Sequence, residues 1–153
     1  MTPALEIQTH EGEVERSILD EHQQLRLRLK DLDASLVRVA AGSGQAFVDA
    51  RRMFLDLLVA FGRHLEHEES LLVPMLARLD AWGPVRLEQL LREHADQRGE
   101  IAQLASLDAE TSAGHWAALM GEFSGRLRKD MASEDHDFLG PNALSRPGLK
   151  RAG

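Results

Sequence analysis

Residues 64–69 read His-Leu-Glu-His-Glu-Glu, and they interrupt a row of apolar residues that recur at a helical spacing. His64 and Glu68 are four residues apart, so a helix stacks their side chains on one face. The same face carries Phe61 before this stretch and Leu71 after it. A buried carboxylate is costly unless it is paired or bound to a metal. The stretch therefore predicts a helix that places an imidazole and a carboxylate in a protein core.

Three further segments show apolar residues at spacings of three and four, without the strict alternation of strands. Clusters of glycine, proline and small polar residues separate the four segments at 42–44, 82–84 and 108–114. We expect helices over about residues 11–40, 45–80, 85–107 and 112–139. Pro84 suits a first helical turn, whereas Pro74 should kink or shorten the end of the second helix. Short connections between long amphipathic helices favour an all-α fold, an up-down-up-down four-helix bundle.

Each predicted apolar face is interrupted by imidazole or carboxylate side chains. These candidate metal ligands are His22, His64, Glu68, His94, Asp130 and Glu134. Counted from the turns at 1.5 Å per residue, His22 lies level with His64, and Glu68 level with His94. Asp130 is offset from that level by about six residues. Convergence of these groups inside a bundle is typical of a metal site.

Composition narrows the class of protein further. The 153 residues are 43% hydrophobic and 28% charged, which indicates one folded domain. A formal net charge of −7 argues against nucleic-acid binding. The absence of cysteine excludes disulfides and thiolate metal sites. No apolar run is long enough for a membrane span and no basic–apolar leader is visible, so we expect a soluble cytoplasmic protein that does not bind membranes.

The chain is expected to divide into an N-terminal arm (1–12), the bundle (13–140) and a flexible C-terminal tail (141–153). The tail begins at Pro141 and lacks apolar periodicity, as frayed chain ends do.

The six candidate ligands, in their order along the chain, resemble the hemerythrin-like family, also called the HHE cation-binding domain. The resemblance covers about residues 14–141. It implies a four-helix bundle that holds a di-iron centre. By position, His22 and His64 would ligate one metal and His94 the other. Glu68 and Glu134 would bridge the two metals.

The chain departs from the family pattern at two positions. Asp130 stands where the family usually has histidine, and Arg98 stands where oxygen-carrying hemerythrins have a second histidine of the third helix. Both departures leave the second metal poorer in nitrogen ligands. The resemblance then implies a protein that binds or senses O2, NO, peroxide or iron, rather than one that carries oxygen reversibly. Two iron ions are expected, with one ion or zinc as alternatives.

Other interpretations stay open at this point. The chain is alternatively a structural or interaction bundle with a degenerate or single-metal site. A catalytic version would be a ferroxidase or a peroxidase-like oxidoreductase, although no further acid, base or substrate pocket calls for an enzyme. Asp130 follows a cationic run at 126–129 and fits a surface salt bridge equally well. His67 is predicted to flank the site as a substitute ligand, and His136 to lie on the surface.

A ferritin-like di-iron bundle is disfavoured. That class uses Glu-x-x-His motifs, and no histidine of this chain has an acidic residue three positions before it.

Overall fold

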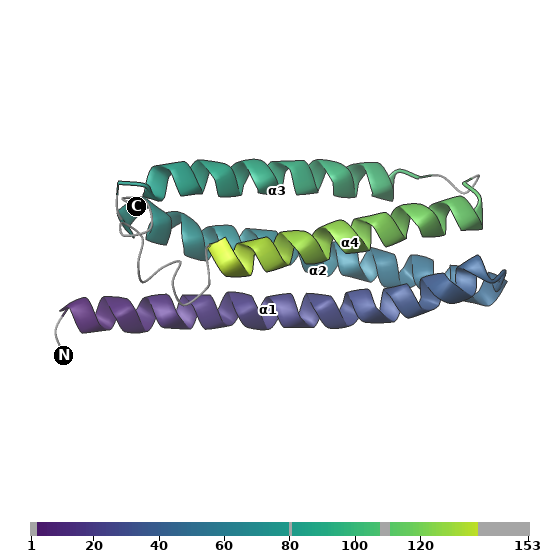
Figure 1. Ribbon diagram of the computed structural model, residues 1–153, viewed down its shortest axis with the longest axis horizontal. Helices are drawn as coiled ribbons and strands as arrows, with labels where there is room; N and C mark the ends of the chain where they lie inside the picture. Colours follow the sequence, from purple (N-terminus) through teal and green to yellow (C-terminus); the bar gives the residue numbers. More distant parts are fainter. Residues whose placement is uncertain (1–2, 80, 108–110, 138–153) are drawn as a thin grey trace.

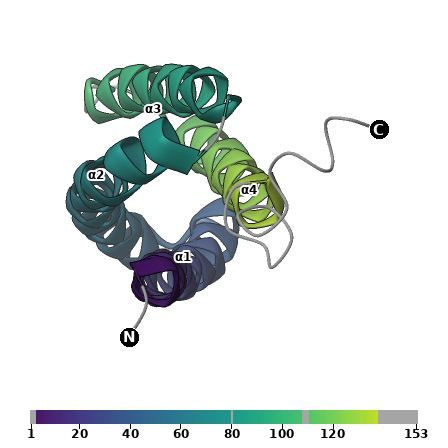
Figure 2. The same cartoon turned by 90° about the vertical axis from the view of Figure 1, so that its left-hand side faces the viewer.

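The computed structural model describes residues 3–79, 81–107 and 111–137, which form four antiparallel helices (Figure 1). The helices are α1 (Pro3–Ala40), α2 (Gly44–Leu79), α3 (Gly83–Ala105) and α4 (Ala113–Asp137). Helix α1 packs against α2 and α4, and α2 packs against α3. Seen end-on, the four helices surround a common axis (Figure 2). The expected up-down-up-down four-helix bundle is confirmed.

Helix α1 begins at Pro3, eight residues before the expected start at residue 11. Most of the expected N-terminal arm (1–12) therefore continues the first helix. Proline is favoured in a first helical turn, and a single glycine at position 12 costs a helix only about 1 kcal/mol. Nothing in the sequence between these two residues ends the helix.

Pro74 does not end the second helix, which continues to Leu79. The proline is exposed, whereas Leu72, Met75 and Leu76 around it are buried. Packing of these three side chains offsets the loss of one backbone hydrogen bond. The observed ends of the other helices lie within two residues of the expected ones, and residues 138–153, with the expected tail, lie outside the described part.

Two glycines fix the connections between the helices. Gly42 has φ 95° in the turn after α1, a conformation that side chains other than glycine rarely adopt. Ser43 then accepts a hydrogen bond from the amide of Ala46 and caps the start of α2. At the start of α3, a Cβ on Gly83 would lie 1.8 Å from the backbone oxygen of Leu76. The α2–α3 turn therefore needs glycine at position 83, because its backbone lies against that of Leu76.

The core consists of two apolar clusters along the bundle. The larger one includes Leu25, Phe61 and Leu127, and extends toward the α1–α2 turn. The smaller one includes Ile18, Leu72 and Leu90, toward the α2–α3 turn. His22 falls between Ile18 and Leu25 along α1, and residues 64–68 fall before Leu72 along α2. A layer of polar side chains thus separates the two clusters.

Within the described ranges, no helix is both long and apolar enough to span a bilayer.

Candidate metal centre

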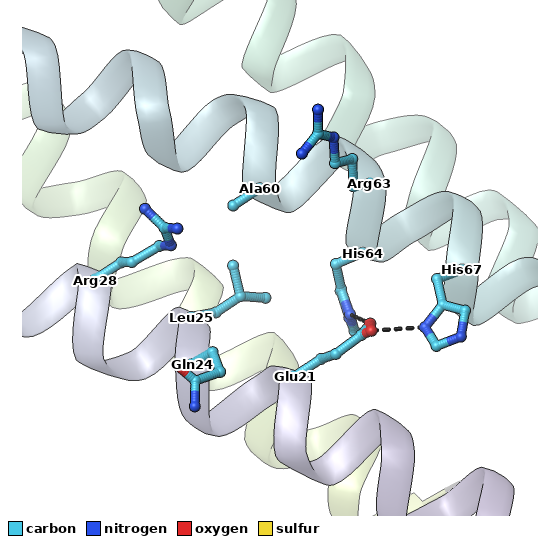
Figure 3. Close-up of a pocket in the computed structure, with 8 residues that line it drawn as sticks. All are labelled: Glu21, Gln24, Leu25, Arg28, Ala60, Arg63, His64 and His67. Atoms are coloured by element: carbon cyan, nitrogen blue, oxygen red, sulfur yellow. Dashed lines mark hydrogen bonds and ion pairs between the residues drawn. The ribbon is translucent and has the colours of Figure 1, made fainter.

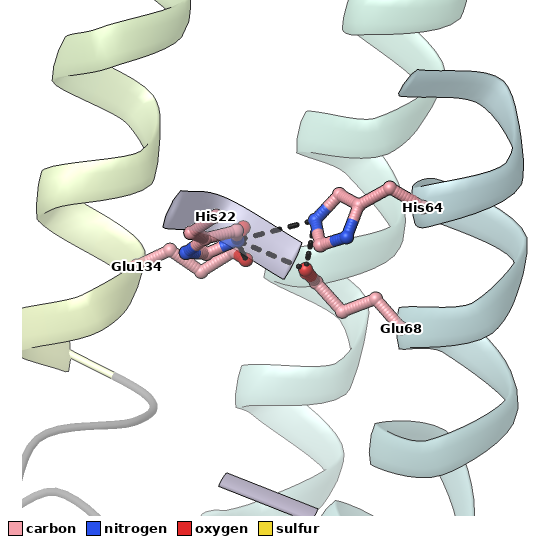
Figure 4. Close-up of side chains that lie close together, drawn as sticks. All are labelled: His22, His64, Glu68 and Glu134. Carbon is pink, nitrogen blue, oxygen red and sulfur yellow. Dashed lines mark hydrogen bonds and ion pairs between the residues drawn. The ribbon is translucent and has the colours of Figure 1, made fainter. Parts of the chain in front are cut away.

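Four buried side chains from three helices meet in the polar layer (Figure 4). His22 comes from α1, His64 and Glu68 from α2, and Glu134 from α4. Each offers one nitrogen or oxygen, and these four atoms lie within 4.8 Å of one another. The exposed fraction of these residues is 6% or less. A heptad-like apolar face places each of them inward, as the sequence predicted from the spacing of their neighbours.

The shortest distance in this group joins a nitrogen to a carboxylate oxygen. His64 Nε2 lies 2.7 Å from Glu68 Oε2. His22 Nε2 lies 3.2 Å from Glu134 Oε1 and 3.4 Å from Glu68 Oε2. The Nε2 atoms of His22 and His64 are themselves only 3.1 Å apart. Two imidazoles and two carboxylates therefore direct their ligand atoms at one small volume.

His94 of α3 reaches the same layer through Glu68. Its Nε2 lies 3.0 Å from Glu68 Oε1, and the histidine is fully buried. The two oxygens of Glu68 consequently face opposite ways, Oε1 toward His94 and Oε2 toward His22 and His64. That is the arrangement a carboxylate needs to bridge two neighbouring cations.

Each of the three imidazoles also contacts a second carboxylate through Nδ1, the ring nitrogen that faces away from the centre. His22 Nδ1 lies 2.5 Å from Asp135 Oδ1, and His64 Nδ1 lies 2.9 Å from Glu21 Oε1. His94 Nδ1 lies 2.9 Å from Glu69 Oε1. An ionised carboxylate only accepts hydrogen bonds, so each Nδ1 carries the hydrogen. Nε2 of each imidazole then faces the centre, and its lone pair is available to a cation once the proton on Nε2 is released.

The centre contains buried hydrogen-bond acceptors. Glu68 Oε2 and Glu134 Oε1 are buried without a hydrogen-bond partner among the described residues, although imidazole nitrogens lie near both. Most buried polar atoms in proteins have a partner, and an exception points to a missing ion or water. Imidazole nitrogen and carboxylate oxygen are ligands that iron and zinc both accept. The residues present therefore fit a cation bound among them.

The pKa values of the buried histidines and glutamates in this layer depend on one another. Burial raises the pKa of Glu134, and the nearby Glu68 adds to this, so that the value reaches about 8. Burial alone would lower the pKa of His22, but Asp135, Glu134 and Glu68 outweigh it and raise the value to about 11. Burial raises the pKa of Glu68, but three imidazoles reverse this and bring it well below its usual range. Protons and a cation thus compete for the same lone pairs.

Asp130, the remaining predicted ligand, is exposed and lies outside the group of four. Its Oδ2 accepts a hydrogen bond of 3.2 Å from Gln97 Nε2. Arg98, where the family pattern has histidine, bonds Glu69 Oε1 at 2.7 Å. Glu69 is the carboxylate behind His94, so Arg98 fixes this second carboxylate.

The other histidines lie on the surface. His67 is 43% exposed, and its Nδ1 lies 2.6 Å from Glu21 Oε2. His10, His115 and His136 are also exposed.

A cavity of about 390 Å³ lies between α1 and α2 beside the centre (Figure 3). His64 and Leu25 form part of its wall. Arg28 and Arg63 also line it, and both are exposed, so the cavity opens to solvent. It gives a small molecule a route to the outer side of His64.

The carboxylates Glu21, Glu69 and Asp135 are not among the site residues predicted from the sequence. Each directly follows or precedes a predicted ligand in the sequence, and each bonds an imidazole of a different helix. Their position next to a ligand was the available signal. Gln97 of α3 is likewise not among the site residues predicted from the sequence.

Comparisons with known proteins give one match. A sequence model of the family described as "Hemerythrin HHE cation binding domain" matches residues 13–140. Neither the curated proteins nor the solved structures contain a significant match to the chain.

Proposed function

The chain belongs to the hemerythrin HHE cation-binding family, and on this premise we propose that it is a non-haem di-iron protein that binds or senses O2, NO or peroxide. The observation that carries the proposal is the convergence of His22, His64, Glu68 and Glu134, whose ligand atoms lie within 4.8 Å of one another. Bound iron would supply an open coordination position and a redox change for such ligands.

The residues of the chain have distinct parts in this proposal. His22 and His64 would hold one iron, and His94 would hold the other. Glu68 and Glu134 would supply carboxylate charge to both ions, which would offset the charge change between ferrous and ferric iron. Glu21, Glu69 and Asp135 keep the imidazoles in the tautomer that directs Nε2 at the metal. Phe61 is buried, and its ring, stacked 6.3 Å from that of His64, provides an apolar neighbour for this imidazole.

The cavity beside His64 supports a small ligand rather than a large substrate. Its volume of about 390 Å³ is near the lower end for ligand pockets, and its wall includes only one of the proposed ligands. We infer that O2 or NO reaches the centre from this side of α1 and α2. We propose a binding or sensing protein, and turnover assays with ferrous iron and with peroxide test the alternative of a ferroxidase or peroxidase-like activity.

A site with a single metal is the second candidate, and one observation favours it. Among the described residues, four ligand atoms form the compact group, and all of them lie on the His22 and His64 side. In such a protein, His94 would bond Glu68 without binding a metal, at the 3.0 Å distance seen here. The number of metal ions per chain separates the two candidates.

The test is anaerobic loading with ferrous iron, removal of excess metal, and elemental analysis. We expect about two irons per chain and a change in visible absorption when air or NO is added. His64→Ala and Glu68→Ala should each lose most of the iron, because they remove a ligand from the group. His115→Ala, an exposed histidine of α4, is the matched control and should bind iron as the unaltered protein does. A chain that stays free of iron and zinc after loading would contradict the proposal.

A further inference from the structure

The side-chain amide of Gln97 has a buried carbonyl oxygen, and a hydrogen bond at its nitrogen fixes its orientation. It lies on α3 three residues after His94, so the two side chains are neighbours on the helix surface. Its carbonyl oxygen, Oε1, is buried and has no hydrogen-bond partner among the described residues. Its amide nitrogen, Nε2, donates to Asp130 Oδ2 on α4 at 3.2 Å. The side chain thus has its amide nitrogen at Asp130 near the surface and its carbonyl oxygen buried.

The hydrogen bond to Asp130 decides which way the amide points. An ionised carboxylate accepts hydrogen bonds and cannot donate them. The NH2 group of Gln97 must therefore face Asp130, and Oε1 must face away from it, where it is buried. The negative charge of Asp130 also makes the carbonyl oxygen at the other end of the amide more electron-rich.

We propose that Gln97 Oε1 is a ligand of the second cation, beside His94, and that Asp130 is a positioning residue that orients the amide. This inference rests on the proposed function above. Glu68 supports it, because its Oε1 faces His94 while its Oε2 belongs to the first group of ligands. Gln97 then supplies an oxygen on α3, where Arg98 cannot act as a ligand.

The proposed second position contains one imidazole nitrogen, with oxygen for the remaining protein ligands. Oxygen ligands suit harder divalent ions, whereas additional imidazoles suit zinc and copper. We therefore expect this position to take ferrous or manganous ions, and to bind them more weakly than the first position, which has two imidazoles.

The experiment compares Gln97→Leu with Gln103→Leu, an exposed glutamine of the same helix. Both are titrated anaerobically with ferrous iron by calorimetry, and bound iron is counted after desalting. Gln97→Leu should keep the first ion at unchanged affinity and lose the second, or bind it at least about 10-fold more weakly. Gln103→Leu should bind both ions normally. The metal-free melting temperature of Gln97→Leu should change little, because the change removes a buried acceptor that lacks a partner together with one exposed hydrogen bond to Asp130.

A second pair of variants tests the positioning residue. Asp130→Asn both donates and accepts, so it no longer holds the amide in one orientation. We expect the affinity for the second ion to fall about 10-fold, with the first ion unaffected. Asp96→Asn, on the exposed side of α3, should change neither affinity.

The outcomes separate this inference from the proposed function. If Gln97→Leu binds both ions with normal affinity, the amide oxygen has another partner, such as water, and the inference is wrong. If the unaltered protein binds one ion only, the second position does not exist, while metal binding itself stands. If the unaltered protein binds no ion, both proposals fail together.

Discussion

The three carboxylates behind the imidazoles follow one rule of placement. Glu21 is next to His22 on α1 but bonds His64 of α2. Asp135 of α4 bonds His22 of α1 in the same way. In each pair of adjacent residues, the ligand points to the centre and the carboxylate beside it contacts an imidazole of the neighbouring helix. Adjacent residues of a helix point about 100° apart, so one position faces the core and the other the interface between helices.

Glu21→Gln tests whether such a carboxylate matters for metal binding. The glutamine keeps the size of the side chain but loses the charge that holds the Nδ1 hydrogen of His64. Removing a carboxylate behind a metal-bound histidine typically costs about 10–100-fold in metal affinity, and we expect a loss in that range. Competition with a chromophoric chelator measures the affinity.

His67→Gln is the matched control for this change. His67 also contacts Glu21, yet it is exposed and lies outside the group of ligands. This variant should bind metal almost normally. A loss as large as that of Glu21→Gln would mean that His67 is the substitute ligand considered from the sequence.

The sequence could predict the ligands on the helix faces, but not the carboxylates that contact the Nδ1 atoms of these ligands. His22, His64 and Glu68 stand on helix faces that are otherwise apolar, so their burial follows from periodicity alone. Glu21 and Asp130 are both acidic residues beside such a face, yet one bonds a buried imidazole and the other a partly buried glutamine. That difference depends on which neighbouring helix lies within reach.

At the scale of the helices, the apolar spacing and the glycine and proline clusters were sufficient to predict four helices and their order. The ends were harder to predict, because tertiary contacts decide whether a weak signal stops a helix. Pro74 remains inside α2 between buried Leu72 and Met75, although its sequence alone favours a break. The close approach at Gly83 involves Leu76, seven residues earlier, and no local pattern reveals it.

Gly83→Ala should destabilise the protein. The added Cβ would lie 1.8 Å from Leu76 O, a backbone atom that moves only if the α2–α3 turn opens. We expect a loss of about 1–3 kcal/mol in the free energy of unfolding. Urea unfolding followed by circular dichroism measures it. Gly99→Ala is the control in the middle of α3, where no atom lies within 4 Å of the added Cβ.

The control should change stability in the opposite direction. Alanine favours a helix over glycine by about 1 kcal/mol, so Gly99→Ala should raise the free energy of unfolding. Equal stability of the two variants would show that the α2–α3 turn adjusts without strain.

At the scale of the whole molecule, the polar layer divides one apolar core into two clusters. Burial raises the pKa of Glu134, and the nearby Glu68 adds to this rise. A bound cation would offset both the loss of solvation and the repulsion from Glu68, and would favour the ionised form of Glu134. Metal binding should therefore stabilise the folded bundle, because the unfolded chain does not hold these ligands together.

The melting temperature with and without metal measures this linkage. At a metal concentration 100 times Kd, binding adds about 2.7 kcal/mol to the free energy of unfolding. For a chain of 153 residues, that corresponds to a rise of about 5–11 °C, at 2–4 °C per kcal/mol. A chelator should reverse the rise completely.

Two variants distinguish a local metal effect from general stability. Glu68→Gln keeps the size of the bridging side chain but removes its charge, so the metal-dependent rise should largely disappear. Leu65→Ala instead opens a cavity in the larger cluster, where Leu65 is 1% exposed. It should lower the free energy of unfolding by about 2–5 kcal/mol with or without metal, and it should keep the metal-dependent rise. Loss of that rise in Leu65→Ala would mean that the centre depends on the packing around it as much as on its ligands.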